Sequence, residues 1–118
     1  MDLVSFITCE DDGTDQIVSF AVVDDEMDVR SLILLRTPKY EPLLEEYERG
    51  VSVSAETDWV DEPDLLTLVR FDANLITIES QAARYELDVR RVEPAEVSEM
   101  KALFERMNFD RRFRIEYV

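Results

Sequence analysis

Carboxylates are the side chains in this sequence with the most obvious potential for chemistry. The 118 residues include 28 Asp and Glu, and a pair of carboxylates can act as general acid and base in hydrolysis. With so many acids, close pairs arise by chance, and spacing singles out none of them. The sequence contains no His, which removes Ser-His-Asp and Cys-His nucleophile systems in their usual form. We therefore predict no catalytic residues and a protein that is not an enzyme.

Cofactor sites also lack their usual residue types. Cys9 is the only cysteine, so zinc sites built from Cys and His are excluded, as is an intrachain disulfide. We expect Cys9 to be a small core residue. We also expect the protein to lie in a reducing compartment. Gly13 and Gly50 are the only glycines, which excludes the common Gly-rich phosphate loops. We predict that the protein binds no cofactor.

The acidic stretch around Gly13 resembles part of a calcium loop. Asp11 and Asp15 flank this glycine, but an EF-hand needs Gly at its sixth position and Glu at its twelfth. Counted from Asp11, those positions hold Gln16 and Val22. We therefore expect a solvated turn and no metal site.

Negative charge is concentrated in one part of the chain. The formal net charge is −15, and residues 1–83 account for all of it with 20 acidic and 5 basic residues. Residues 84–118 contain eight of each. A field with this direction speeds encounter with a basic partner and repels nucleic acid and anionic lipid. We predict a basic protein partner, and neither nucleic acid nor a membrane.

Three arginines near the end of the chain form a basic cluster. Arg111, Arg112 and Arg114 are accompanied by Asp110 and Glu116. Because the whole domain repels phosphate, we expect these arginines to pair with the acidic body of the protein.

The stretch 56–64 is the most partner-like in the sequence. It holds the only Trp, Trp59, and five carboxylates: Glu56, Asp58, Asp61, Glu62 and Asp64. Tryptophan is common in interface hot spots, and carboxylates around it can engage Arg and Lys of a partner. The alternative is that Trp59 turns inward and fills the core beneath a solvated loop, and the sequence leaves both open. Nearby Glu45 and Glu48, on an acidic face with Glu41 and Glu46, extend the predicted partner-binding surface.

Hydrophobic periodicity indicates how this surface is supported. Apolar and polar residues alternate, as in half-buried strands, over 51–56, 84–90 and 112–117. Denser apolar runs that indicate more fully covered strands lie at 3–9, 17–23, 32–35, 65–71 and 75–78. Short polar turns between them predict an antiparallel, meander-like sheet of six to eight strands.

Two segments have helical character. Apolar residues spaced as on one helix face predict a main helix over 94–108; they are Val97, Met100, Leu103, Phe104 and Met107. A shorter helix is predicted near 42–49, with an apolar side formed by Leu43, Leu44 and Tyr47. The fold class is therefore α+β, with the main helix packed on one face of the sheet.

Length and composition fit one acidic α+β domain over residues 1–118. The start of the chain, Met1-Asp2-Leu3, lacks the positive segment of a signal peptide. The longest apolar runs are far too short to cross a bilayer. We expect a cytoplasmic protein.

Part of the chain resembles a known family. The residues that carry the resemblance are Ser19-Phe20-Ala21, the acidic turn at 24–28 and Ser31-Leu32-Ile33-Leu34-Leu35-Arg36, followed by Gly50, further strands and a terminal helix. Over roughly 17–107 this order is similar to that of the immunity-protein-ten-like family of bacterial polymorphic toxin systems. Leu35 stands where that family tends to have Gln, and Glu62-Pro63-Asp64 replaces its glycine-rich turn.

The resemblance implies a small protein that binds and neutralises a cognate toxin, often a nuclease. It carries over no catalytic residue. Two other classes stay open: a type III secretion-type chaperone that binds an effector segment, and a structural or regulatory domain. Such chaperones typically open with a helix, whereas this chain opens with strand-like residues 3–7.

Overall fold

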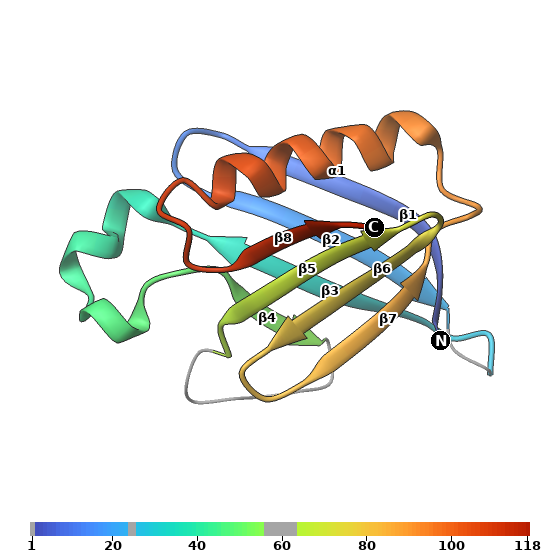
Figure 1. Ribbon diagram of the computed structural model, residues 1–118, viewed down its shortest axis with the longest axis horizontal. Helices are drawn as coiled ribbons and strands as arrows, with labels where there is room; N and C mark the ends of the chain where they lie inside the picture. Colours follow the sequence, from blue (N-terminus) through green and yellow to red (C-terminus); the bar gives the residue numbers. More distant parts are fainter. Residues whose placement is uncertain (1, 24–25, 56–63) are drawn as a thin grey trace.

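The computed structural model describes residues 2–23, 26–55 and 64–118. These residues form one eight-stranded sheet and one main helix, which confirms the predicted α+β class (Figure 1). The strands are β1 (Asp2–Asp11), β2 (Gln16–Val23), β3 (Val29–Arg36), β4 (Ser52–Ala55), β5 (Leu66–Asp72), β6 (Leu75–Ser80), β7 (Arg84–Asp88) and β8 (Arg114–Tyr117). The main helix is α1 (Pro94–Met107).

The sheet combines two antiparallel meanders with two parallel contacts. Its order is β4-β3-β2-β1-β7-β6-β5-β8. Strands β1–β4 form one antiparallel meander and β5–β7 the other. The predicted short turns connect these strands except β3 and β4, between which two 3₁₀ helices lie. The parallel pairs are β1 with β7 and β5 with β8. The second of these is possible because α1 separates β7 from β8 and provides the long crossover that parallel strands need.

The sheet curls, so that β1–β4 lie behind β5–β8 in Figure 1. On one side, β4 meets the beginning of β5: the Val53 N–H donates to the Asp64 carbonyl and the Leu66 N–H donates to the Val51 carbonyl, both at 2.8 Å. On the other side, β1 and β7 pair only near the start of β1. Further along β1, the Ile7 N–H donates to the Glu96 carboxylate of α1 at 2.8 Å. The helix therefore covers the opening between the two halves.

The core lies between the inner sides of the strands and α1. Met100, Leu103, Phe104 and Met107 are fully buried, as the helical spacing predicted. Val97, which the same spacing placed in the core, is only partly buried, at its margin. The Phe104 ring lies 6.4 Å from the Phe71 ring of β5 and 6.3 Å from the Phe113 ring. In the parts of the chain that the structure describes, no helix is long and apolar enough to span a bilayer.

The segment predicted as a short helix at 42–49 has a different structure. It forms two 3₁₀ helices, η1 (Pro38–Leu43) and η2 (Glu46–Glu48). Pro42 lacks a backbone N–H and disfavours α conformation in the residue before it, which prevents one continuous α-helix. Leu43 and Tyr47, expected on the inner side, are 84% and 76% exposed. In Figure 1 this segment (teal to green) extends beyond the end of the sheet.

Candidate partner-binding surface

The predicted acidic loop lies mostly outside the described residues. Glu56, Asp58, Trp59, Asp61 and Glu62 fall in this part of the chain, and their role stays a prediction. The sixth predicted contact residue of that stretch, Asp64, is described. Its carboxylate accepts hydrogen bonds from the Ser80 hydroxyl at 2.6 Å and from the Ala82 N–H at 3.0 Å. Asp64 thus stabilises the turn between β6 and β7, a structural role that the sequence did not indicate.

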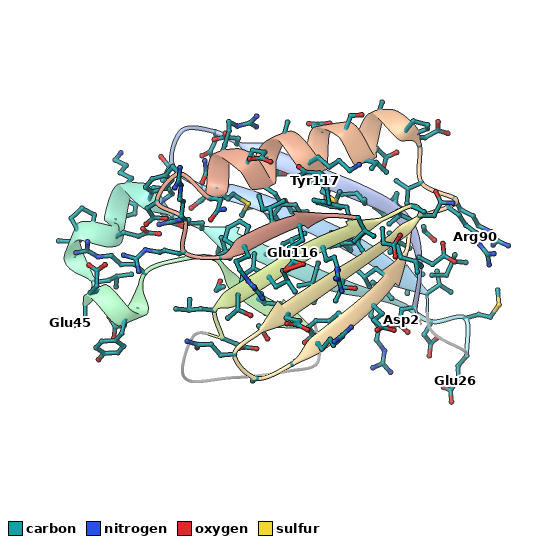
Figure 2. All side chains as sticks on the ribbon, viewed as in Figure 1. Asp2, Glu26, Glu45, Arg90, Glu116 and Tyr117 are labelled. Carbon is teal, nitrogen blue, oxygen red and sulfur yellow. The ribbon has the colours of Figure 1, made fainter. Side chains whose placement is uncertain are left out.

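Glu45 is the N-cap of η2, and Glu48 is its last residue. The Glu45 N–H donates to the Glu48 carboxylate at 3.3 Å, and the Glu48 N–H donates to the Glu45 carbonyl at 3.0 Å. The first contact belongs to a capping box, and the second is the backbone hydrogen bond of the 3₁₀ turn. Figure 2 shows Glu45 at the end of the molecule, directed away from the sheet. Both predicted residues are therefore on an outward-facing segment.

Apolar side chains are exposed on the same segment. Tyr40 is 52% exposed, Leu43 84%, Leu44 42% and Tyr47 76%. Tyrosines with carboxylates around them are typical of binding surfaces, because a rigid ring buries a large area on contact. Sequence reasoning assigned Leu43, Leu44 and Tyr47 to the inner side of a helix and so missed this feature. We call residues 38–48 the η segment.

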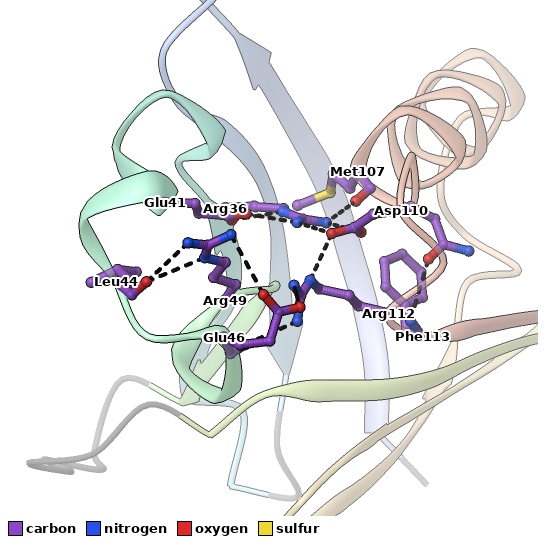
Figure 3. A network of polar contacts seen from close by, with 10 residues as sticks. Arg36, Glu41, Leu44, Glu46, Arg49, Met107, Asp110, Arg112 and Phe113 are labelled. Atoms are coloured by element: carbon purple, nitrogen blue, oxygen red, sulfur yellow. Dashed lines mark hydrogen bonds and ion pairs between the residues drawn. The ribbon is translucent and has the colours of Figure 1, made fainter.

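A buried arginine holds the η segment in place. Arg36, at the end of β3, has a fully buried side chain. Its Nε and Nη2 donate to both carboxylate oxygens of Glu41 at 2.7 Å, and Nη1 and Nη2 donate to Asp110 at 2.9 and 2.8 Å. Nη1 also donates to the Met107 carbonyl at 2.7 Å (Figure 3). The Phe109 ring lies 4.2 Å from the guanidinium carbon.

These contacts satisfy all five N–H groups of the guanidinium, which burial of the charge requires. Burial by itself would lower the pKa of Arg36, but the hydrogen bonds to Asp110 and Glu41 outweigh it and raise the pKa. The hydrogen bond from Arg36, more than that from Arg112, lowers the pKa of Asp110 to about 2. Glu41 was predicted on an acidic face with Glu45, Glu46 and Glu48, and it is instead buried, because it pairs with the buried Arg36.

Arg112 extends the network to η2. It donates to the Asp110 carboxylate and to the Glu46 carboxylate, both at 2.6 Å. For Arg112 this agrees with the expectation that the basic cluster pairs with the acidic body, whereas Arg114 pairs with Glu116 of its own strand at 3.7 Å. The network connects the end of β3, the η segment and the residues that follow α1, so the η segment is fixed on the body of the protein.

A groove of about 460 Å³ lies beside the η segment. It is lined by Leu35, Thr37, Tyr40, Glu41, Leu44, Glu48, Gly50, Ser52 and Leu65. Leu35 and Ser52 also belong to the outer side of the sheet, so the groove joins the η segment to that side.

The outer side of β1–β4 is almost free of charge. Alternation along each strand, with a β-bulge in β1 between Val4 and Phe6, places these residues opposite the core side chains. They are Leu3, Phe6, Thr8, Glu10, Ile17, Ser19, Ala21, Val23, Val29, Ser31, Ile33, Leu35, Ser52 and Ser54. Glu10, at one corner, is the charged residue among them. Phe6 is 50% exposed, Val29 60% and Leu35 36%. We call this set the β1–β4 outer face.

Acidic turns border the β1–β4 outer face at both strand ends. The turn at 11–15 follows β1, and residues 26–28 precede β3. In the first turn the Asp12 carboxylate accepts hydrogen bonds from the N–H groups of Asp15 and Thr14 at 2.8 and 2.9 Å, which lower the pKa of Asp12. Asp11 pairs with Arg106 of α1 at 3.0 Å. Among the described residues, no cluster of three His, Cys, Asp or Glu side chains could hold a metal ion.

The other outer side of the sheet, on β5–β8, is charged. Arg84 pairs with Glu79 at 3.1 Å and with Glu86 at 3.3 Å, and Glu116 pairs with Arg70 at 3.6 Å. Exposed charges that pair with one another are typical of a solvated surface. The two halves of the sheet therefore present different surfaces.

Cys9 is partly buried beside α1. Burial, and next the charge of Glu99, raise the pKa of its thiol to about 11. A thiol with such a raised pKa is a poor nucleophile at neutral pH.

Comparison with protein-family models, with curated proteins and with solved structures found no match to this chain. The proposed function therefore rests on the surfaces of this chain itself.

Proposed function

We propose that this chain is a non-catalytic binding protein that docks a basic protein partner on the β1–β4 outer face and the adjoining η segment. The observation that carries the proposal is the uncharged, partly apolar face bordered by acidic turns. Protein interfaces combine an apolar, charge-depleted centre with a polar rim. A large uncharged face is unusual on a protein in which 35% of the residues are charged.

The charge of the partner follows from the rim. Carboxylates around an uncharged centre attract Lys and Arg during the diffusional approach and exclude acidic partners. The Arg36 network supports the same function because it holds Tyr40 and Leu44 in place before binding. A surface that is already ordered loses less conformational entropy when the partner docks.

The partner class that fits best is a toxin, as the resemblance to the immunity-protein-ten-like family implies. A nuclease toxin needs a basic surface to hold phosphates. An acidic protein with an apolar docking face could cover such a surface and block access of the nucleic acid. Trp59 and its neighbouring carboxylates, which lie outside the described residues, stay predicted contacts of the partner.

The test is whether a gene for a basic toxin lies beside the gene for this chain, and whether the two proteins bind one another. Phe6→Lys places a charge on the β1–β4 outer face, and Thr67→Lys places the same charge on the outer side of β5. Loss of a hot-spot contact costs about 2 kcal/mol, or roughly 30-fold in affinity. We expect a loss of this size for Phe6→Lys and little change for Thr67→Lys, in variants that remain folded. Equal binding by both variants would exclude this face, and a turnover abolished by replacing one carboxylate would contradict a non-catalytic role.

A further inference from the structure

The outer edge of β8 is open. Among the described residues, β8 pairs with β5 only. The Val118 N–H donates to the Phe71 carbonyl of β5 at 2.9 Å. Because backbone groups of successive strand residues point to opposite sides, the N–H and C=O groups of Ile115 and Tyr117 point away from β5. These are the groups that an additional strand would use.

There is room for a strand at this edge. A groove of about 560 Å³ runs along β8, lined by all four strand residues together with Glu105, Asn108, Arg111 and Phe113. At one end the Tyr117 hydroxyl donates to the Glu105 carboxylate at 2.9 Å. Figure 2 shows Tyr117 between β8 and α1, and Glu116 over the outer side of the sheet.

The sequence of β8 is complementary to itself. In an antiparallel pair centred on Ile115, Arg114 of each copy lies opposite Glu116 of the other. Ile115 faces Ile115 of the second copy and exchanges two backbone hydrogen bonds with it, because its N–H and C=O point outward. The charged residues then form the closer, non-hydrogen-bonded pairs, in which side chains interact most strongly. A two-fold axis creates each favourable contact twice.

The charge distribution permits this approach. Residues 84–118, which include β8, carry no formal net charge, whereas residues 1–83 carry −15. Two copies that meet at β8 therefore bring neutral segments together. A dimer through the β1–β4 outer face would instead bring the acidic turns of two copies together, which repel.

We propose that two copies of this chain associate through antiparallel pairing of their β8 strands around Ile115. A pair of four-residue strands buries a small area, which places the dimer in the weak, reversible class. The association does not depend on the proposed function. It involves the opposite half of the sheet and leaves both β1–β4 outer faces free.

Charge reversal tests the pairing. Arg114→Glu and Glu116→Arg each put like charges opposite one another twice in the dimer. In sedimentation equilibrium at about 0.15 M salt, where the Debye length is about 8 Å, we expect each to weaken dimerisation about tenfold or more. Arg84→Glu and Glu86→Arg, on β7, change the net charge equally and should leave the dimer intact.

Two further samples restore the complementarity. The double variant Arg114→Glu/Glu116→Arg should dimerise like the original chain. An equimolar mixture of the two single variants should form a heterodimer, because the two acidic side chains of one variant's β8 then face the two arginines of the other's. In the original chain, the amide protons of Ile115 and Tyr117 should gain protection from exchange as concentration rises.

Three results would overturn the proposal. The first is a chain that stays monomeric at millimolar concentration under these conditions. The second is a dimer that the single reversals leave unchanged, which would place the contact elsewhere. The third is a mixture of folded single variants that remains monomeric.

Discussion

The two outer sides of the sheet differ although their inner sides are alike. Both halves direct Val, Ile, Leu and Phe side chains into one core. On β5–β8 the outer positions include charged residues of both signs that form ion pairs, such as Arg84 with Glu79, beside the uncharged Leu68, Leu75 and Thr77. On β1–β4 they are Ser, Thr, Ala and apolar residues, with Glu10 at the corner. Folding explains the shared core but not the difference outside.

This difference shows where the charged residues of the acidic half of the chain lie. The strands β1–β4 lie within residues 1–83, which carry the whole net charge, yet their outer face is nearly neutral. Apart from Asp2 and Glu10, the carboxylates of the described residues up to Ala55 are instead in the turns at 11–15 and 26–28 and on the η segment. Such a separation matches the charge-depleted centre and polar rim of protein interfaces, and it supports the proposed function.

The largest expected effect tests whether the two halves are one cooperative unit. Phe104 of α1 is fully buried and contacts Phe71 of β5. Phe104→Ala should lower the free energy of unfolding by about 3–5 kcal/mol, as truncation of a buried Phe does. Urea unfolding followed by circular dichroism and by fluorescence should give one coincident transition. Val97→Ala, at the core margin, is the control and should cost less; separate transitions for the two halves would contradict a shared core.

The next effect concerns the connection between the η segment and the sheet. Glu41→Gln weakens the pairing of a fully buried guanidinium and should cost about 3 kcal/mol, as broken buried ion pairs do. Glu46→Gln removes an acid whose side chain is 79% exposed, and should cost at most about 1 kcal/mol. Urea unfolding of both variants measures the difference. Similar small losses would mean that the network does not hold the η segment rigidly.

A smaller effect on the free energy of unfolding is expected at acidic pH. The pKa of Asp110 is about 2 in the folded protein, lowered from 3.8 chiefly by the hydrogen bond from Arg36. A carboxyl whose pKa is lower in the folded than in the unfolded state stabilises the protein at pH values above the unfolded-state pKa. This contribution is lost as pH falls from about 4 toward 2. The free energy of unfolding, measured at a series of pH values, should therefore decline over this range. Asp110→Asn should decline less steeply, and an identical pH dependence would show that Asp110 is not held by Arg36.

Local patterns predicted most of the fold. All eight strands coincide with stretches in which apolar residues alternate or cluster, and α1 coincides with the one clear helical period. These signals depend on neighbouring residues and on which side of an element faces the core. The parallel contact of β1 with β7 could not be read from them, because it follows from the curl of the whole sheet.

The candidate surface was less accessible to sequence reasoning. Arg36 and Asp110 are 74 residues apart, and no local pattern connects them. One signal was available: Leu32, Leu34 and Arg36 share the inner side of β3, so alternation alone places this arginine inside. The absence of charge on the β1–β4 outer face was also visible once the strands were aligned, but their register comes from the structure.

The smallest stability effects are expected on the two outer faces themselves, and they sharpen the comparison most directly. Arg84→Gln removes exposed ion pairs and should change the free energy of unfolding by about 0–1 kcal/mol. The Phe6 side chain is already 50% exposed, so only part of its apolar area is withdrawn from water on folding. Phe6→Ser should therefore lower the free energy of unfolding by about 1 kcal/mol. Urea unfolding measures both.

If Phe6→Ser cost more than about 2 kcal/mol, Phe6 would be a core residue and the β1–β4 outer face would be explained by folding. With similar small costs on both faces, a loss of partner binding by Phe6→Ser alone would separate the docking surface from the solvated one.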